Sequence, residues 1–157
     1  MKPTLIVGLG NPLMGADGIG CRVAEALSTD PRLPADTEVL RGGTDLLRLA
    51  VEGRHRVILI DAALEGSGGP IPRTAHALSV LEAMNLLQLE SPNVAFTLIT
   101  VSVDAVEFGD ELPPALVAKM PEIVDTVIGA CRAAPTSSSR LSRDSESPTS
   151  SPSSATT

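Results

Sequence analysis

The chain has 157 residues, of which 43% are hydrophobic and 20% charged, as in a globular protein of roughly one domain. Its 19 acidic residues outnumber its 12 basic ones, and its only aromatic residues are two phenylalanines. We expect no nucleic-acid partner, which would need a basic surface and aromatic platforms for the bases. The longest apolar stretches, residues 57–64 and 94–103, are too short to cross a bilayer, and no leader-like segment opens the chain. We therefore expect a cytoplasmic protein without a membrane partner.

The composition changes once, at residue 135. Residues 135–157 consist mainly of Ser, Thr and Pro, with Leu141 as the only large apolar side chain. Such a segment buries too little apolar surface to offset the entropy lost when it becomes ordered. The sequence therefore predicts a folded domain at 1–134 and a disordered tail at 135–157.

In the folded part, apolar runs of strand length alternate with stretches of helical period, which is typical of an α/β domain with a mainly parallel sheet. The expected elements, in chain order, are a strand at 4–7, a helix at 18–27, a strand at 37–40, a short helix at 46–50, a central strand at 56–60, a helix at 78–89, a strand at 93–103 and a helix at 114–132. Asp45 is a candidate cap for the short helix, and Pro121 is expected to kink the last helix or to begin a new one. The unbroken Val-Ile-Leu-Ile run of the central strand indicates burial on both faces.

The turn after the first strand carries five glycines and one carboxylate between Gly8 and Gly20. In a parallel sheet this turn lies at the carboxyl edge of the strands, where ligands usually bind. A dinucleotide site is one interpretation, but the spacing is GxGxxxxG instead of GxGxxG. Pro12 and Asp17 also stand where a pyrophosphate needs free backbone N–H groups and no negative charge. Asp17 can instead cap the following helix, since a carboxylate near a helix N-terminus accepts backbone N–H bonds.

Two further polar side chains are expected close to this turn. Asp61 directly follows the central strand at the same edge, where it is either a turn or cap residue or a functional carboxylate. His76 stands just before the next helix, where the alternative to function is a surface or capping role. Together Asp17, Asp61 and His76 offer two carboxylates and one imidazole, a plausible donor set for a divalent metal with open positions. The other histidine, His55, precedes the central strand and is expected to be structural, at the opposite end of the sheet.

Several short motifs follow one another along the chain in a recognisable order. They are Gly8-Leu9-Gly10-Asn11 with Asp17-Gly18-Ile19-Gly20, then Gly42-Gly43-Thr44, Ile60-Asp61-Ala62, and the Thr-x-His-x-Leu pattern of residues 74–78. In this order they resemble the signature of the hydrogenase maturation endopeptidases and cover most of residues 4–130. The resemblance implies an α/β, three-layer sandwich of the phosphorylase/hydrolase-like type, with a twisted, mainly parallel five-stranded sheet flanked by helices. It also implies that Asp17, Asp61 and His76 are the catalytic and metal-binding residues.

The resemblance implies an activity as well. Members of this family are aspartyl endopeptidases that remove a short C-terminal extension from the large-subunit precursor of a nickel–iron hydrogenase after nickel has been inserted. The nickel ion is supplied by the substrate and is the recognition element. We therefore expect a protease that acts, as a monomer, on a nickel-containing hydrogenase precursor. The metal could polarise the scissile carbonyl or activate water, and Asp17 or Asp61 could act as general base.

Two departures from the family pattern and two alternative functions stay open. Ala16 stands where the family usually has the first of two adjacent acids, and the link between Asp61 and His76 is shorter than usual, which affects the strand normally found there. Residues 5–12 also resemble the start of peptidyl-tRNA hydrolases, although no histidine follows before His55. The chain could also be a non-catalytic scaffold that binds the precursor without cutting it, for which Ala16 is the hint.

Overall fold

A computed structural model of the chain describes residues 1–43, 47–64, 75–105 and 107–133, apart from the side chains of residue 48 and of residues 75–79. The described elements are, in chain order, β1 (Thr4–Leu9), the short 3-10 helix η1 (Gly15–Gly18), α1 (Ile19–Ser28), β2 (Thr37–Gly42), α2 (Leu47–Val51), β3 (Arg56–Leu64), α3 (Ala75–Glu90), β4 (Ala95–Val103) and α4 (Pro114–Arg132). The expected alternation of strands and helices is therefore confirmed. The candidate cap Asp45 and the tail at 135–157 lie outside the described residues.

The described strands form one parallel sheet with the order β2-β1-β3-β4. The chain moves outward from β1 to β2 and then crosses back to place β3 on the other side of β1, so the strand order reverses between β1 and β3. Ligands of open α/β sheets usually bind outside the carboxyl ends of the strands at such a reversal. The resemblance implied five strands, whereas the described residues form four. Residues 65–74, the shortened link in which the family normally has a strand, lie outside the described part.

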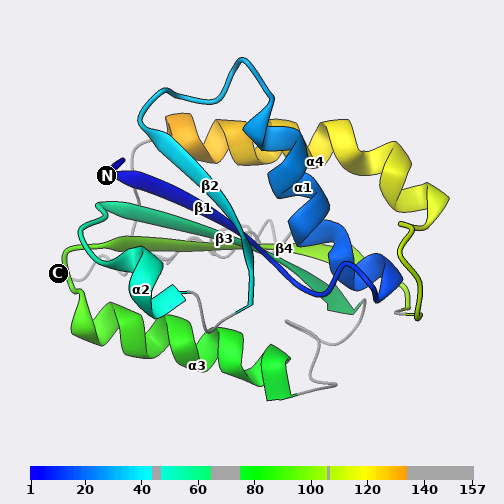
Figure 1. The fold of residues 1–157 in the computed structure, drawn as a ribbon, viewed down its shortest axis with the longest axis horizontal. Helices are drawn as coiled ribbons and strands as arrows, with labels where there is room; N and C mark the ends of the chain where they lie inside the picture. Colours follow the sequence, from blue (N-terminus) through cyan, green and yellow to red (C-terminus); the bar gives the residue numbers. More distant parts are fainter. Residues whose placement is uncertain (44–46, 65–74, 106, 134–157) are drawn as a thin grey trace, which may run out of the picture.

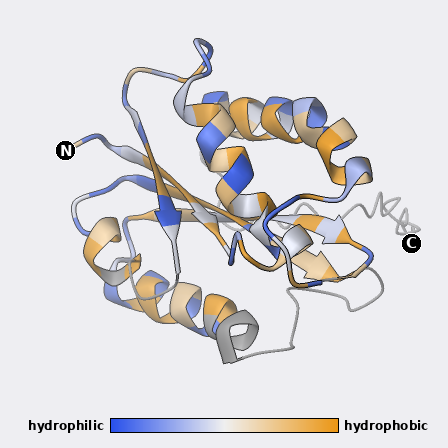
Figure 2. Cartoon of the chain, turned by 45° about the vertical axis from the view of Figure 1, so that its right-hand side comes forward, coloured by the Kyte–Doolittle hydropathy of each residue, from blue (hydrophilic) through white to orange (hydrophobic). Residues whose placement is uncertain are grey.

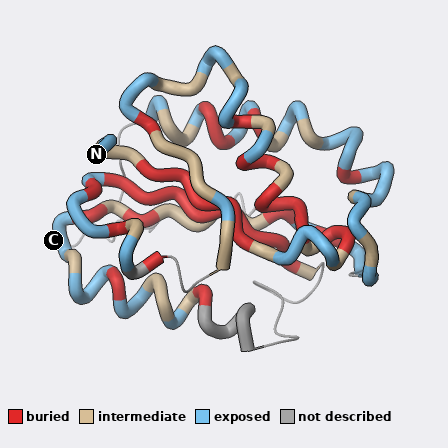
Figure 3. The backbone as a smooth tube through the Cα atoms, in the orientation of Figure 1, coloured by how far each residue is buried: buried red, intermediate tan, exposed pale blue. Residues whose placement is uncertain are grey.

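Helices cover both faces of this sheet, which confirms the three-layer sandwich (Figure 1). On one face Ile6, Ile58 and Ile99 pack with apolar residues of α1 and α4. On the other face Leu59 and Phe96 pack with residues of α2 and α3. Hydrophobic residues run along the central strands in Figure 2, and Figure 3 shows the same strands as the buried centre of the molecule. The central strand β3 is buried from Arg56 to Ala63, as its apolar run predicted.

Several element boundaries differ from the expectation, and two of them concern the site. β3 continues to Leu64 because β4 pairs with it as far as Leu64 and Val103, so Asp61 lies inside the strand and not after it. α3 begins at Ala75, so His76 lies in the first turn of the helix and not before it. The last helix, α4, has the predicted bounds and continues through Pro121, which therefore does not begin a new helix. Among the described residues, no helix has the length and apolar character to span a membrane.

Candidate active site

The turn between β1 and α1 packs against the carboxyl ends of both β1 and β3. A Cβ on Gly20, in the first turn of α1, would lie 2.2 Å from the carbonyl oxygen of Leu9 and 2.5 Å from that of Ile60. Only a glycine allows this approach of the helix backbone to the strand ends. Gly10 has a φ of 125°, and a Cβ there would lie 2.0 Å from the carbonyl oxygen of Asp17. The glycines therefore bring the segment that carries Asp17 next to the strand that carries Asp61.

Asp17 lies half-buried in η1, and the turn before it holds its carboxylate. The backbone N–H of Asn11 donates a hydrogen bond of 3.0 Å to Asp17 Oδ2, and Asn11 Oδ1 in turn accepts one from the backbone N–H of Leu13. The N-cap of α1 is Gly18 and makes no side-chain cap bond, so Asp17 does not act as the helix cap that its position allowed. Within the described part of the chain, Asp17 Oδ1 has no hydrogen-bond donor. One carboxylate oxygen is thus fixed by the backbone, while the other is available to a ligand.

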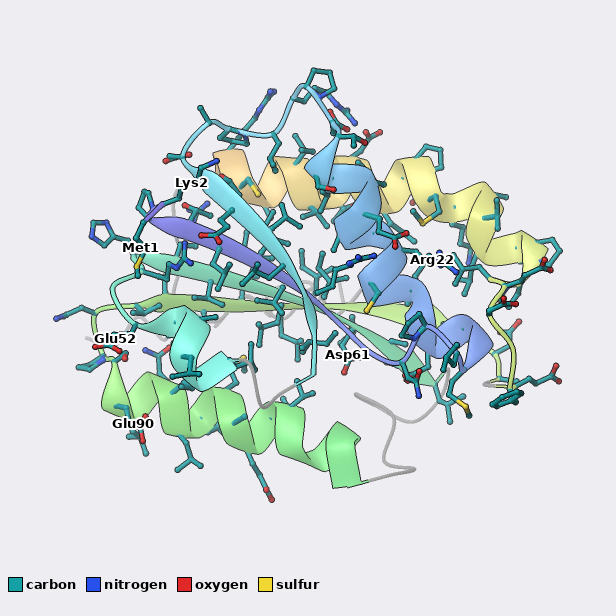
Figure 4. The ribbon with its side chains drawn as sticks, viewed as in Figure 1. Met1, Lys2, Arg22, Glu52, Asp61 and Glu90 are labelled. Carbon is teal, nitrogen blue, oxygen red and sulfur yellow. The ribbon has the colours of Figure 1, made fainter. Side chains whose placement is uncertain are left out.

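Asp61 is a buried carboxylate in the middle of the hydrophobic strand β3, with a side chain only 6% exposed. Strand alternation places it on the face of α2 and α3, together with Val57 and Leu59, and it is labelled there in Figure 4. Its Oδ1 accepts a hydrogen bond of 2.9 Å from the backbone N–H of Ala62. Burial raises the pKa of Asp61 to about 6; the Ala62 hydrogen bond opposes this rise, and the negative charge of Asp17 adds to it. Two neighbouring carboxylates, one of them desolvated, attract a proton or a cation.

His76 is brought to the same end of the fold by the direction of α3. This helix runs back along the sheet, so its N-terminal turn lies towards the carboxyl ends of the strands (Figure 1). The helix covers the face on which Asp61 lies. The imidazole of His76 is outside the described side chains, so its approach to the two carboxylates stays a prediction. Among the side chains that the structure describes, no group of three or more His, Cys, Asp or Glu is placed to hold a metal ion.

Two other reactive side chains, those of His55 and Cys21, have structural surroundings. His55 is exposed at the amino end of β3, where its backbone N–H donates to the carbonyl of Pro3. Cys21 is buried in α1, and its thiol lies 3.6 Å from the carbonyl oxygen of Gly8 and 3.5 Å from that of Gly10. Burial raises the pKa of the Cys21 thiol, so it is not a thiolate nucleophile.

The loop between β4 and α4 forms part of the same rim, a contact that no sequence motif indicated. The backbone N–H of Gly15 donates to the carbonyl of Gly109 at 2.7 Å, and the N–H of Gly109 donates to the carbonyl of Leu13 at 2.8 Å. Arg22 of α1 adds a side-chain bond of 2.7 Å to the carbonyl of Asp110. The acidic residues of this loop, Asp104, Glu107, Asp110 and Glu111, are the only feature of its sequence that could have indicated a functional role.

Comparisons with known proteins agree with the fold and with the resemblance seen in the sequence. No family model matches the chain. The hydrogenase 2 maturation protease of Escherichia coli is 27% identical over 148 residues, which cover 82% of this chain and 90% of that protein. The solved structure of the E. coli hydrogenase maturating endopeptidase HybD superimposes with a TM-score of 0.71 and 25% identity, over 84% of this chain and 93% of that one. The nickel–iron hydrogenase maturation protease HybD of Thermococcus kodakarensis gives a TM-score of 0.64 and 25% identity, over 84% of this chain and all of that one.

These relatives match more than four fifths of the chain, in sequence as well as in fold. With coverage this broad, the similarity is not confined to one short motif. They agree with the resemblance that the ordered motifs of the sequence indicated. Over most of its length the chain is therefore similar, in sequence and in fold, to the hydrogenase maturation endopeptidases.

Proposed function

We propose that this chain is a cytoplasmic, monomeric endopeptidase that removes the C-terminal extension from a nickel–iron hydrogenase large-subunit precursor after nickel insertion. Its relatives are named as hydrogenase maturation proteases and endopeptidases, which supports hydrolysis of a peptide bond. One observation carries the proposal for this chain. The buried carboxylate of Asp61, with a pKa raised to about 6, lies beside Asp17 where the strand order reverses.

The nickel ion belongs to the substrate in this proposal, and the chain supplies donors for it. Two carboxylates and an imidazole suit a divalent ion, and without a thiolate they would bind it only modestly in isolation. Asp17 Oδ1, Asp61 and His76 are the donors that we propose to meet the ion as the precursor docks. When bound, the ion supplies Lewis-acid chemistry, either by polarising the scissile carbonyl or by lowering the pKa of a water molecule.

The raised pKa favours Asp61 as the group that moves the proton. A general base works best when its pKa lies near the working pH, and without the ion the pKa of Asp61 is closer to that than the pKa of an ordinary aspartate. In the proposed reaction the water oxygen attacks the scissile carbonyl carbon while Asp61 accepts the proton of the water. The same carboxyl then gives the proton to the leaving amide nitrogen, so that the C–N bond breaks and a free amine departs.

The scaffold alternative depended on the missing acid at Ala16. Ala16 is 2% exposed and packs in the core cluster of the α1 and α4 face, whereas Asp61 lies on the opposite face of the sheet. The alanine therefore leaves the two carboxylates in place, which weakens the reason to expect a non-catalytic protein. The peptidyl-tRNA hydrolase alternative depends on residues 5–12 alone, and a net charge of −7 disfavours tRNA.

One assay separates these functions. The purified chain is incubated with a nickel-loaded hydrogenase large-subunit precursor, and the large subunit is weighed by mass spectrometry. We expect a loss of mass that corresponds to the C-terminal extension. Binding without cleavage would favour the scaffold, and hydrolysis of peptidyl-tRNA would favour the hydrolase alternative.

The role of His76 is tested separately by His76→Ala. We expect this variant to lose most of the cleavage in the same assay while its circular-dichroism spectrum stays that of the wild type. Cleavage at the wild-type rate would remove His76 from the site and leave the two carboxylates as its remaining members.

A further inference from the structure

Two apolar side chains are exposed at the rim of the proposed active site. Leu13 is 57% exposed, and Phe108 is 85% exposed. The only other aromatic residue of the chain, Phe96, is 4% exposed and lies in the core. Single exposed apolar residues are common on protein surfaces, so exposure alone would mean little. What distinguishes this pair is the way in which the backbone holds it together.

The segments that carry Leu13 and Phe108 are joined by reciprocal backbone hydrogen bonds. Gly109 directly follows Phe108. Its N–H donates to the carbonyl of Leu13, and its carbonyl accepts from the N–H of Gly15. These two bonds form a parallel bridge between Met14 and Gly109. A Cβ on Gly15 would lie 2.8 Å from the carbonyl oxygen of Glu107, so the two loops touch at backbone distance. Leu13 and Phe108 therefore lie on two loops that are hydrogen-bonded to each other, and we call this pair the rim patch.

The rim patch is continuous with the proposed site. The N–H of Leu13 donates to Asn11 Oδ1, and the N–H of Asn11 donates to the carboxylate of Asp17. Leu13 and Asp17 thus belong to one hydrogen-bonded turn. A peptide that reaches Asp17 therefore comes close to the patch.

The charged residues of the two segments that carry the rim patch are all acidic. The segments 8–20 and 104–118, which meet at the patch, contain no Lys or Arg and carry the acidic residues Asp17, Asp104, Glu107, Asp110 and Glu111. The guanidinium of Arg22 is already engaged, because it donates to the carbonyl of Asp110 and forms an ion pair of 3.4 Å with Glu25. The patch therefore suits a partner segment that is apolar and carries basic residues beside the apolar ones.

We propose that the rim patch docks the precursor by binding an apolar side chain of a basic segment close to the scissile bond. This inference rests on the proposed function and names how that site selects its substrate. Exposed aromatic side chains are effective anchors, because they bury a large area when they bind and lose little rotational freedom. The surrounding carboxylates steer the basic segment towards the patch and keep acidic segments away.

Steady-state cleavage of the nickel-loaded precursor tests the patch. Phe108→Ser, Leu13→Ser and the double variant are compared with Leu89→Ser, which replaces a leucine that is 79% exposed in the last turn of α3, away from the site. We expect KM to rise at least about tenfold in the double variant, with kcat nearly unchanged, because the substitutions remove binding contacts and leave the carboxylates intact. The Leu89→Ser control should keep both constants, and melting temperatures check that all variants are folded.

The charge requirement has its own pair of variants. Glu111→Lys places a positive charge beside the patch, and Glu52→Lys makes the same change in the exposed residue that follows α2. We expect KM to rise several-fold in Glu111→Lys alone, and the difference to shrink at high salt, where exposed charges are screened. Equal KM values for the two variants at low salt would overturn the charge part of the proposal.

The outcomes separate this inference from the proposed function. Cleavage by the wild type with an unchanged KM in the double variant would overturn the docking role and leave the protease assignment intact. If the wild type neither binds nor shortens any nickel-loaded precursor, the proposed function fails and the docking role falls with it. A self-associated wild type that becomes monomeric in the double variant, with KM unchanged, would assign the patch to a second copy of the chain.

Discussion

Both ends of the sheet contain buried charged residues, but the partners of these charges differ between the two ends. At the amino end Arg54 and Arg56 are 7% and 8% exposed, and at the carboxyl end Asp61 is 6% exposed. Met1 and Lys2 mark the amino end in Figure 4, and Asp61 lies in the half of β3 nearer its carboxyl end. The burial is thus almost the same, and the difference lies in the partners.

The arginines at the amino end are fully engaged with the protein. Arg54 forms an ion pair of 2.7 Å with Glu38 and donates to the carbonyls of Lys2 and Ala50. Arg56 donates to the carbonyls of Ala130 and Cys131 at 2.9 and 2.8 Å, and also to that of Ala133, so it binds the C-terminal end of α4. A cation at the C-terminus of a helix also interacts favourably with the helix dipole. The buried arginines at this end of the sheet therefore stabilise the fold.

Asp61 has a backbone N–H as its partner and a second carboxylate as its neighbour. A carboxyl group whose pKa is raised by burial reduces the stability of the fold at neutral pH, where it is charged. Groups with such shifted pKa values are often found at functional sites. The comparison teaches that burial of a charge does not reveal its role, whereas the balance between the charge and its partners does. Variants at the two ends test that contrast.

The largest expected effect is loss of cleavage in Asp61→Asn. Asparagine keeps the shape of the side chain and accepts the Ala62 N–H, but it can neither take a proton from water nor neutralise a cation. We expect kcat/KM for the nickel-loaded precursor to fall about 1,000-fold, and a large loss in Asp17→Asn as well. Asp36→Asn, in the exposed turn before β2, is the control and should cleave normally. Wild-type rates in both site variants would reject the proposed site.

At the opposite end of the sheet, Arg56→Met should reduce the stability of the fold without changing the cleavage activity. The variant leaves the carbonyls at the end of α4 without their donor, which should lower the free energy of unfolding by about 3 kcal/mol. Urea denaturation measures this loss, and cleavage per folded molecule should not change. Arg32→Met is the matched control, because its pairs with Asp30 and Asp125 are at the surface and should contribute less than about 1 kcal/mol. An Arg56→Met variant as stable as Arg32→Met would contradict the structural role of this end.

Gly20→Ala tests the close approach that joins the turn to the strands. The added methyl group would meet the carbonyl oxygens of Leu9 and Ile60, neither of which can move without distorting the sheet. We expect a loss of about 2–3 kcal/mol in urea denaturation together with a lower cleavage rate. Gly129→Ala in α4 is the control, since a Cβ there has open space and alanine favours the helix. If Gly20→Ala behaved like Gly129→Ala, the packing of α1 against the strand ends would be refuted.

The effect of pH on stability gives a smaller signal. The pKa of Asp61 is about 6 in the folded chain and near 3.8 when exposed, so the folded state holds more protons between these values and loses stability as pH rises through them. An asparagine at this position does not titrate and lacks this penalty. Asp61→Asn should therefore be more stable than the wild type by about 2 kcal/mol at pH 7.5, within an upper limit of about 3 kcal/mol, and equally stable near pH 3.5. Thermal unfolding from pH 3.5 to 8 measures the difference, and a gain that did not depend on pH would refute its electrostatic origin.

The smallest expected effect belongs to the tail. Removal of residues 135–157 should change the melting temperature by less than about 1 °C, because their composition provides almost no apolar surface to bury. Scanning calorimetry of the shortened and full chains measures this. A drop of several degrees would show that the tail docks on the domain.

Much of the candidate site was predictable from residue types and spacing. The glycine-rich turn after a first strand predicted a ligand edge, and the order of the elements assigned both Asp17 and Asp61 to it. The position of Asp61 inside β3 was not predictable, because the end of a strand depends on how far its neighbour continues to pair, and β4 pairs beyond the level at which β1 ends. The contact of Gly109 with residues 13–15 was not predictable either, since it joins backbone groups far apart in sequence.

The sequence by itself determined the α/β class, the order of the elements and the two carboxylates at the edge, because periodicity and composition are local properties. Tertiary structure alone decided what each buried charge does. Arg56 and Asp61 lie on the same strand and are almost equally buried, yet one is surrounded by carbonyl oxygens from α4 and the other has a like charge beside it. Those surroundings come from segments up to 77 residues away along the chain, and the free energy of a charge depends on what surrounds it in space.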